Sequence, residues 1–152
     1  MKSHRLLWLI PLAVLALDRW AKLASPALPP EGLTLIPGVL GLRYAENRGI
    51  AFSLLSGVPW LLGCVSLAAV LVMLWVLLKK PLPLLPRIGL LLMLGGAAGN
   101  MLDRFFLGYV PDMIEFLFVN FAIFNVADVC LTVGCVLLIV SLLFRPTDWK
   151  EP

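Results

Sequence analysis

Long apolar runs separated by short polar segments dominate the chain. The cleanest run, residues 58–78, carries no charged residue, and about 20 consecutive apolar residues suffice for a helix to span a bilayer. Comparable runs occupy residues 6–24, 84–106 and 122–144. The pattern predicts an all-α membrane protein with four transmembrane helices at about these positions, in a single integral membrane domain over residues 1–152.

The first run also has features of a secretory signal peptide, because basic residues precede its apolar stretch. No small-x-small cleavage site follows it, and the chain continues as LDRWAKLASP over residues 17–26. We therefore expect the first run to be retained as a transmembrane helix.

The two segments on the other side from the termini differ in character. Residues 33–55 combine β-branched residues with glycines, which predicts short strands in a small extracytoplasmic sheet. Residues 107–121 are mostly apolar but carry Asp112 and Glu115, which favours a short amphipathic helix in the membrane interface. The connector at residues 79–87, KKPLPLLPR, is typical of a tight link.

Composition and charge agree with a membrane protein and set its orientation. The chain is 61% hydrophobic and 14% charged, against about 25% charged residues in soluble domains. By the positive-inside rule, the side with most basic residues is cytoplasmic, so both termini are expected there and the longer loops outside. The net charge of +3 follows from this asymmetry and indicates no nucleic acid partner. The basic residues on the cytoplasmic side are Lys2, Arg5, Lys79, Lys80, Arg87, Arg145 and Lys150.

The cysteines and the single histidine do not indicate a disulfide framework or a metal site. Cys64, Cys130 and Cys135 all fall in apolar runs, so we interpret them as small buried hydrophobic residues and expect no disulfide framework. The single histidine, His4, lies in the N-terminal tail. A metal site built on imidazole is therefore not expected.

Polar residues within the apolar runs collect at the outer ends of the predicted helices. Ionisable residues inside a membrane usually mark function, although they can also pair structurally. Asp18 and Lys22 are four apart and share a helix face, so we interpret them, and also Asp103 with Arg104, as structural pairs. The spacing of Gly95 and Gly99 predicts close helix packing, and leaves open a close approach of substrate backbone. The outer polar residues are Asp18, Lys22, Asn47, Arg48, Asn100, Asp103, Arg104, Asp112, Asn125 and Asp128.

Asp112 and Asp128 have no basic residue within a helical turn in the sequence. Two carboxylates close together in a low-dielectric site share one proton and titrate as a unit. One carboxylate can then activate water while its protonated partner polarises a carbonyl group, as in aspartic proteases. The spacing alone leaves a purely structural role open.

Five sequence blocks follow one another along nearly the whole chain: DRWAK (18–22), NRGIAFSLL (47–55), GGAAGNMLDR (95–104), GYVPDMIEF (108–116) and FNVAD (124–128). Together and in this order, they resemble the lipoprotein signal peptidases, also called signal peptidase II. The resemblance implies an aspartyl endopeptidase of the bacterial inner membrane, with its active site near the outer leaflet. Such enzymes remove signal peptides from diacylglyceryl-modified prolipoproteins by cleavage before the lipidated cysteine. They need no metal or organic cofactor and are inhibited by globomycin.

The resemblance also implies roles for individual residues. Asp112 and Asp128 match the catalytic pair. Pro111 and Met113 depart from the family, which usually has an aliphatic residue before the first aspartate and often phenylalanine after it. Proline removes a backbone donor, so we expect altered kinetics. Residues implied in substrate binding or in support of the pair are Asp18, Lys22, Asn47, Gly49, Gly96, Asn100, Asp103, Arg104, Val110, Asn125 and Ala127.

Three other functions stay open at this point. A small transporter or proton channel would also carry intramembrane acids, although transport sites tend to lie near the midplane. A Ser–Lys hydrolase could pair Lys22 with Ser25, Ser53 or Ser56, although Pro26 ends the helix directly after Ser25. In a non-enzymatic assembly factor, the polar residues would only hold the helices together.

Overall fold

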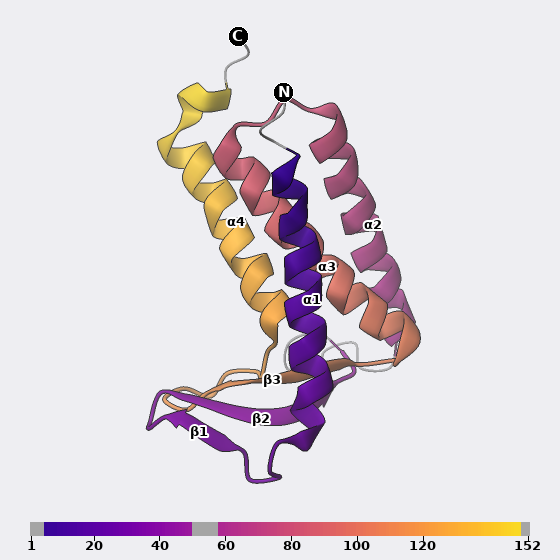
Figure 1. The fold of residues 1–152 in the computed structure, drawn as a ribbon, viewed down its shortest axis with the longest axis vertical. Helices are drawn as coiled ribbons and strands as arrows, with labels where there is room; N and C mark the ends of the chain where they lie inside the picture. The colour runs from indigo at the N-terminus through magenta and orange to yellow at the C-terminus, as the bar shows by residue number, and fades with distance from the viewer. Residues whose placement is uncertain (1–4, 50–57, 150–152) are drawn as a thin grey trace.

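The structure is a computed structural model that describes residues 5–49 and 58–149. These residues form long helices and a small antiparallel sheet (Figure 1). Most of the NRGIAFSLL block, with Ser53 and Ser56, lies outside the described residues, as does His4. The elements are η1 (Leu6–Trp8), α1 (Leu9–Ala24), η2 (Ser25–Ala27), β1 (Leu33–Ile36), β2 (Leu40–Asn47), α2 (Pro59–Lys79), α3 (Leu84–Phe106), β3 (Val110–Phe116), α4 (Val126–Phe144) and η4 (Pro146–Trp149).

Three helices of the described chain, α2, α3 and α4, are long and apolar enough to cross a membrane. The helix α1 has 16 residues and carries Asp18, Arg19 and Lys22 in its second half. Pro59 starts α2 at a position where its missing N–H would have no helical partner. The mostly helical membrane fold predicted from the apolar runs is therefore confirmed.

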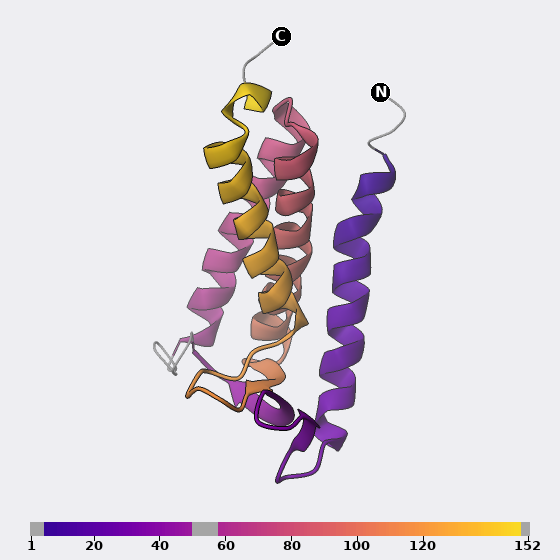
Figure 2. The ribbon, with the colours of Figure 1, turned by 90° about the vertical axis from the view of Figure 1, so that its left-hand side faces the viewer.

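The sheet lies across the end of the helices where α1 and α3 end and α4 begins (Figure 2). Its order is β1-β2-β3, with antiparallel neighbours. Ala45 pairs with Asp112 and Asn47 with Val110. The small sheet expected from residues 33–55 is present, and a third strand from a distant part of the chain joins it.

That third strand corrects the prediction for residues 107–121, where a short interfacial helix was expected. Gly108, at φ +76°, follows the end of α3 in a conformation that other residues rarely adopt. The chain then enters β3, whose first residues are buried. An apolar segment with two acids can form either element, and pairing with β2 decides for the strand because it satisfies the backbone groups.

The start of α4 is also later than the predicted position 122. Ile114 and Phe124 exchange backbone hydrogen bonds of 2.8 and 3.0 Å, which hold the chain extended up to that point. Asn125 then caps the helix, because its side chain accepts a hydrogen bond from the Asp128 N–H. The helix can begin only after this cap.

Glycines let α3 pack closely against two other helices. A Cβ atom on Gly95 would lie 2.8 Å from Val14 Cβ of α1, and one on Gly96 would lie 2.5 Å from the Ala127 carbonyl oxygen of α4. Only the bare backbone fits at these distances. The predicted packing role of Gly95 is confirmed, and the apolar core continues between α2 and α3 around Leu91.

The cysteines are not buried as expected. Cys64 and Cys135 are exposed on the surfaces of α2 and α4, Cys130 is half-buried, and all three are free thiols. The apolar runs are so long that helix surfaces as well as interfaces are apolar, and the sequence does not separate the two.

Candidate active site

A buried lysine joins α1 to α3 at the end of the helices beside the sheet. Lys22 Nζ lies 2.7 Å from Asp18 Oδ2 and 2.6 Å from Asp103 Oδ2. The same ammonium donates a hydrogen bond of 2.8 Å to Asn100 Oδ1. All three N–H groups of this buried cation therefore have acceptors, which is what offsets its loss of hydration.

Asp103 does not form the expected pair with its neighbour Arg104. Its ion pairs are with Lys22 and with Arg19, whose Nη1 lies 2.8 Å from Asp103 Oδ1. Arg104 Nη2 instead donates to the Gly49 carbonyl oxygen at 3.0 Å. Consecutive residues on a helix point about 100° apart, so Asp103 faces α1 while Arg104 faces the chain after β2.

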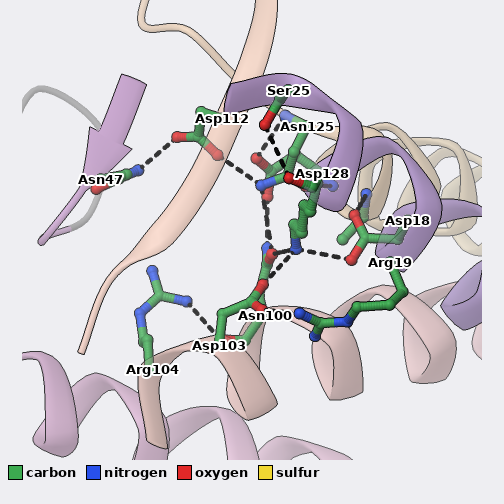
Figure 3. A network of polar contacts seen from close by, with 12 residues as sticks. Asp18, Arg19, Ser25, Asn47, Asn100, Asp103, Arg104, Asp112, Asn125 and Asp128 are labelled. Carbon is green, nitrogen blue, oxygen red and sulfur yellow. Dashed lines mark hydrogen bonds and ion pairs between the residues drawn. The ribbon is translucent and has the colours of Figure 1, made fainter. Parts of the chain in front are cut away.

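Asn125 contacts both aspartates of the predicted pair. Its Nδ2 donates to Asp112 Oδ1 at 2.6 Å, and its backbone N–H donates to Asp128 Oδ2 at 3.2 Å. Its Oδ1 accepts from the Asp128 N–H at 3.0 Å, which completes a capping box. The N-cap residue of α4 thus brings Asp112 of β3 beside Asp128 of α4 (Figure 3).

Two further asparagines complete the hydrogen bonding of the pair. Asn47 Nδ2 donates to Asp112 Oδ2 at 3.0 Å, and Asn100 Nδ2 donates to Asp128 Oδ1 at 2.8 Å. Each of the four carboxylate oxygens therefore accepts an N–H group. Such charge-assisted bonds fix the orientation of both side chains.

The environment of Asp112 favours its protonated form. The residue is 1% exposed, and this burial raises the pKa of Asp112 from 3.8 to about 6. The charge of Asp128 adds to the rise in pKa, whereas the hydrogen bonds from Asn125 and Asn47 oppose it. A proton can therefore reside on this carboxyl group close to neutral pH.

A cavity of about 530 Å³ lies beside Asp128, at the start of α4. Asp128 is among the residues that line it, whereas Asp112 is 1% exposed and is joined to Asp128 through Asn125. Aromatic and aliphatic side chains form most of the wall. The lining residues are Asn47, Arg104, Phe116, Phe121, Ala122, Ile123, Phe124, Asp128, Val129, Thr132 and Val133.

The other predicted residues position the backbone segments that surround the two aspartates. The Ala127 N–H, fully buried at the start of α4, donates to Asp18 Oδ1 at 3.0 Å. Gly96 lets the Ala127 carbonyl approach α3. The Gly49 N–H donates to Asn47 Oδ1 at 3.0 Å, and Val110 pairs with the same asparagine in the sheet.

Sequence reasoning missed Arg19 and the aromatic wall. Arg19 stands beside Asp18, so its basic side chain was visible, but nothing in the spacing indicated Asp103 as its partner. Phe116 and Phe124 lie 5.0 Å apart between ring centroids. They come from two sides of a loop and meet only because that loop folds back on β3.

The site offers proton transfer and hydrogen bonding rather than a serine nucleophile at Ser25. Ser25 Oγ donates to the Lys22 carbonyl oxygen at 2.9 Å, while the Lys22 ammonium is occupied by other partners. Lys22 is therefore not available as a base for Ser25. Over residues 5–49 and 58–149, no three His, Cys, Asp or Glu side chains are grouped so as to hold a metal ion.

Comparison with known proteins shows which family the chain matches. Residues 10–144 match the signal peptidase (SPase) II family. The chain is 42% identical over 151 residues to a lipoprotein signal peptidase of Streptococcus thermophilus, covering 93% of each chain. It is 39% identical over 152 residues to one of Streptococcus pyogenes, covering 98% of this chain and 96% of the relative. A solved bacterial membrane enzyme superimposes with a TM-score of 0.85 at 28% identity, covering 95% of this chain and 91% of that one.

Proposed function

The chain belongs to the signal peptidase II family, and from this premise we propose how its residues cleave a prolipoprotein. It is a protease, and it removes signal peptides from prolipoproteins. The observation that carries the proposal is the joint binding of Asp112 and Asp128 by Asn125, beside a cavity. These two aspartates are the catalytic pair.

The charges around the pair support a single shared proton. The pair and the groups that interact with it most closely comprise three cations and four carboxylates, so one proton makes this set neutral; Arg43 with Glu115 and Arg48 with Glu46 form separate ion pairs at the sheet. A neutral cluster is favoured because unbalanced charge is costly in a low-dielectric site. The cations are Arg19, Lys22 and Arg104, and the acids are Asp18, Asp103, Asp112 and Asp128.

In the reaction, the ionised carboxylate takes a proton from a water molecule, whose oxygen attacks the carbonyl carbon before the lipidated cysteine. The protonated partner donates a hydrogen bond to the carbonyl oxygen. The tetrahedral intermediate collapses when its C–N bond breaks and the departing nitrogen receives a proton. No step requires a metal ion or an organic cofactor.

The cavity suits an extended segment of a diacylglyceryl-modified prolipoprotein. A peptide in a helix has its carbonyl groups hydrogen-bonded, so the scissile bond must be extended to be attacked. Asn47 and Arg104 offer N–H donors to its backbone, while the wall around Phe124 accommodates apolar side chains. Globomycin is expected to inhibit by occupying the same cavity.

The exposed apolar surface supports four spans, with α1 as the fourth. Leu9, Leu12 and Leu17 of α1 are each more than half exposed, as expected for side chains that contact lipid. The basic residues Arg5, Lys79 and Arg145 lie at the helix ends away from the sheet. With that end cytoplasmic, the catalytic pair lies near the outer leaflet of the bacterial inner membrane.

A cleavage assay tests the assignment of the pair. Purified protein in detergent is given a diacylglyceryl-modified prolipoprotein, with and without globomycin, and cleavage is followed by gel shift. Wild type and Glu115→Gln, an acid on the same strand as Asp112, should cleave, whereas Asp128→Asn should not. Cleavage by a folded Asp128→Asn protein at a near-normal rate would contradict the catalytic role.

A further inference from the structure

The side-chain amide of Asn100 lies between a cation and a catalytic aspartate. Its Oδ1 accepts from Lys22 Nζ at 2.8 Å, and its Nδ2 donates to Asp128 Oδ1 at 2.8 Å. An amide has one end that only accepts and one end that only donates. Which end faces Asp128 decides whether that carboxylate meets a donor or another acceptor.

Lys22 determines the orientation of this amide. An ammonium group can only donate, so the amide oxygen must face it. In the reversed orientation, the NH₂ group of Asn100 would meet the ammonium, and its oxygen would meet the Asp128 carboxylate. Both contacts would be repulsive, whereas the observed orientation makes two hydrogen bonds.

Lys22 is itself held in place by its surroundings. Asp18 and Asp103 occupy its two other N–H groups at 2.7 and 2.6 Å, and its side chain is 1% exposed. Arg19 holds Asp103 from the other side at 2.8 Å. In the observed position, the three N–H groups of the ammonium are therefore all taken up by Asp18, Asp103 and Asn100.

The amide of Asn125 does not depend on Lys22 in this way, and that of Asn47 lies on Asp112 instead. Asn125 Oδ1 accepts from the Asp128 N–H at 3.0 Å, so the backbone of α4 already orients that amide. Asn125 Nδ2 also lies 3.3 Å from Asn100 Oδ1, a longer contact than the one from Lys22. Asn100 is therefore the amide whose direction rests mainly on Lys22.

We propose that Lys22 is a positioning residue, which acts on the cleavage reaction through Asn100 by turning the amide N–H group toward Asp128. This inference rests on the proposed catalytic role of Asp128. The buried ion pairs around Lys22 then do more than hold α1 against α3. They set the direction of the hydrogen bond that one catalytic carboxylate receives.

The test removes the ammonium while keeping the net charge of the site. In the charge-balanced variant Lys22→Met/Asp103→Asn, one buried cation and one buried anion disappear together. Asp103→Asn alone is the matched reference, because it keeps Lys22 facing Asn100. We expect kcat for the diacylglyceryl-modified prolipoprotein to fall at least tenfold from the reference with KM unchanged, because small misplacements of catalytic groups lower rates by about that much or more. The thermal midpoint should fall as well, because Asp18 loses its ion pair with Lys22, so the split between kcat and KM in the folded protein is the deciding measurement.

A second comparison asks whether the effect passes through Asn100. In the Asn100→Leu/Asp103→Asn chain, adding Lys22→Met should lower kcat no further, since the amide that transmits the effect is gone. The proposal would be overturned if Lys22→Met lowered kcat by the same factor with and without Asn100. It would also be overturned if kcat fell less than threefold in the first comparison. Measurement under single-turnover conditions with excess enzyme extends the range of rates that can be read.

A third variant serves where the double substitution does not fold. Asn100→Asp keeps a partner for Lys22 and removes the N–H group facing Asp128, so kcat should again fall at least tenfold in a stable protein. Near-normal kcat would overturn the proposal. Failure of wild type to cleave would instead count against the catalytic pair itself, and the two results are distinguishable.

Discussion

The two halves of α3 illustrate different uses of the same helix. In its first half, Leu91 is 1% exposed and packs in the apolar core with residues of α2 such as Leu77. In its last two turns, Asn100, Asp103 and Arg104 hold hydrogen bonds or ion pairs with other elements. The first half makes contacts by shape, and the second makes them by charge and hydrogen bonding.

The two halves of α3 therefore set different properties of the bundle. The apolar half sets the distance between the helices, and the polar end sets the direction of the hydrogen bonds between them. Close packing brings α1 and α4 near enough to α3 for hydrogen bonds to form, and the polar end then selects one arrangement of donors and acceptors. Substitutions in the apolar half should therefore act on stability. Substitutions at the polar end should act on cleavage.

The largest expected effect comes from the polar end. Asp112→Asn and Asp128→Asn should each lower kcat about 10³-fold or more, because loss of one member of a catalytic unit removes most of its contribution. The asparagine side chains preserve size, so the thermal midpoint should stay near that of wild type. The measurement is single-turnover cleavage of the modified prolipoprotein together with thermal unfolding in detergent.

A substitution where the two halves meet should affect both properties. In Gly96→Ala, the new Cβ would lie 2.5 Å from the Ala127 carbonyl oxygen, which is backbone and cannot rotate away. We expect α4 to shift, the free energy of unfolding to fall by about 1–3 kcal/mol, and kcat to fall roughly tenfold as Asp128 moves. Denaturant titration and the cleavage assay measure the two effects.

Gly63→Ala is the matched control for that substitution. Its Cβ would meet the Phe105 ring at 3.0 Å, and a side chain can turn aside. Its kcat should stay within about twofold of wild type. An equal loss of kcat in both variants would mean that any added methyl group in the bundle disturbs the site.

The apolar half is tested by Leu91→Ala. Removing a buried leucine leaves a cavity, and we expect the free energy of unfolding to fall by about 2–4 kcal/mol. The kcat of the folded fraction should change less than twofold, because the polar end is untouched. Leu142→Ala, at a side chain that is 55% exposed, should change stability by no more than about 0.5 kcal/mol.

The smallest expected effect is a shift in the pH dependence of cleavage activity. The hydrogen bond from Asn47 lowers the pKa of Asp112, so Asn47→Leu should raise that pKa above about 6. Activity needs one proton on the pair of aspartates, so the alkaline limb of the activity profile should move to higher pH by about half a unit to one unit. The profile of kcat against pH measures this, with Arg43→Gln as a control that should show no shift.

The same pKa predicts how stability varies with pH. Because the folded-state pKa of Asp112 lies above its ordinary value of 3.8, its stabilising contribution is full below that value and is lost as pH rises through about 6. In Asn47→Leu, this loss should occur at higher pH. A stability profile identical to that of wild type would show that Asn47 does not act on Asp112.

Particular residues show what could be predicted and what could not. The pair of Asp18 and Lys22 follows from their spacing on one helix, and the structure has them 2.7 Å apart. The partners of Asp103 did not follow, because Lys22 and Arg19 lie on another helix. The strand β3 did not follow either, since its pairing partner β2 is far away in the sequence.

The sequence by itself determined the apolar runs that form the helices, the family blocks, and the two aspartates that stand without a basic neighbour. Only the tertiary structure decided that Asn125 binds both aspartates, that Asp128 rather than Asp112 lines the cavity, and that Lys22 orients Asn100. The physical reason is that helix periodicity is local and can be read from spacing. The direction of a hydrogen bond between distant elements depends on distances that packing alone sets.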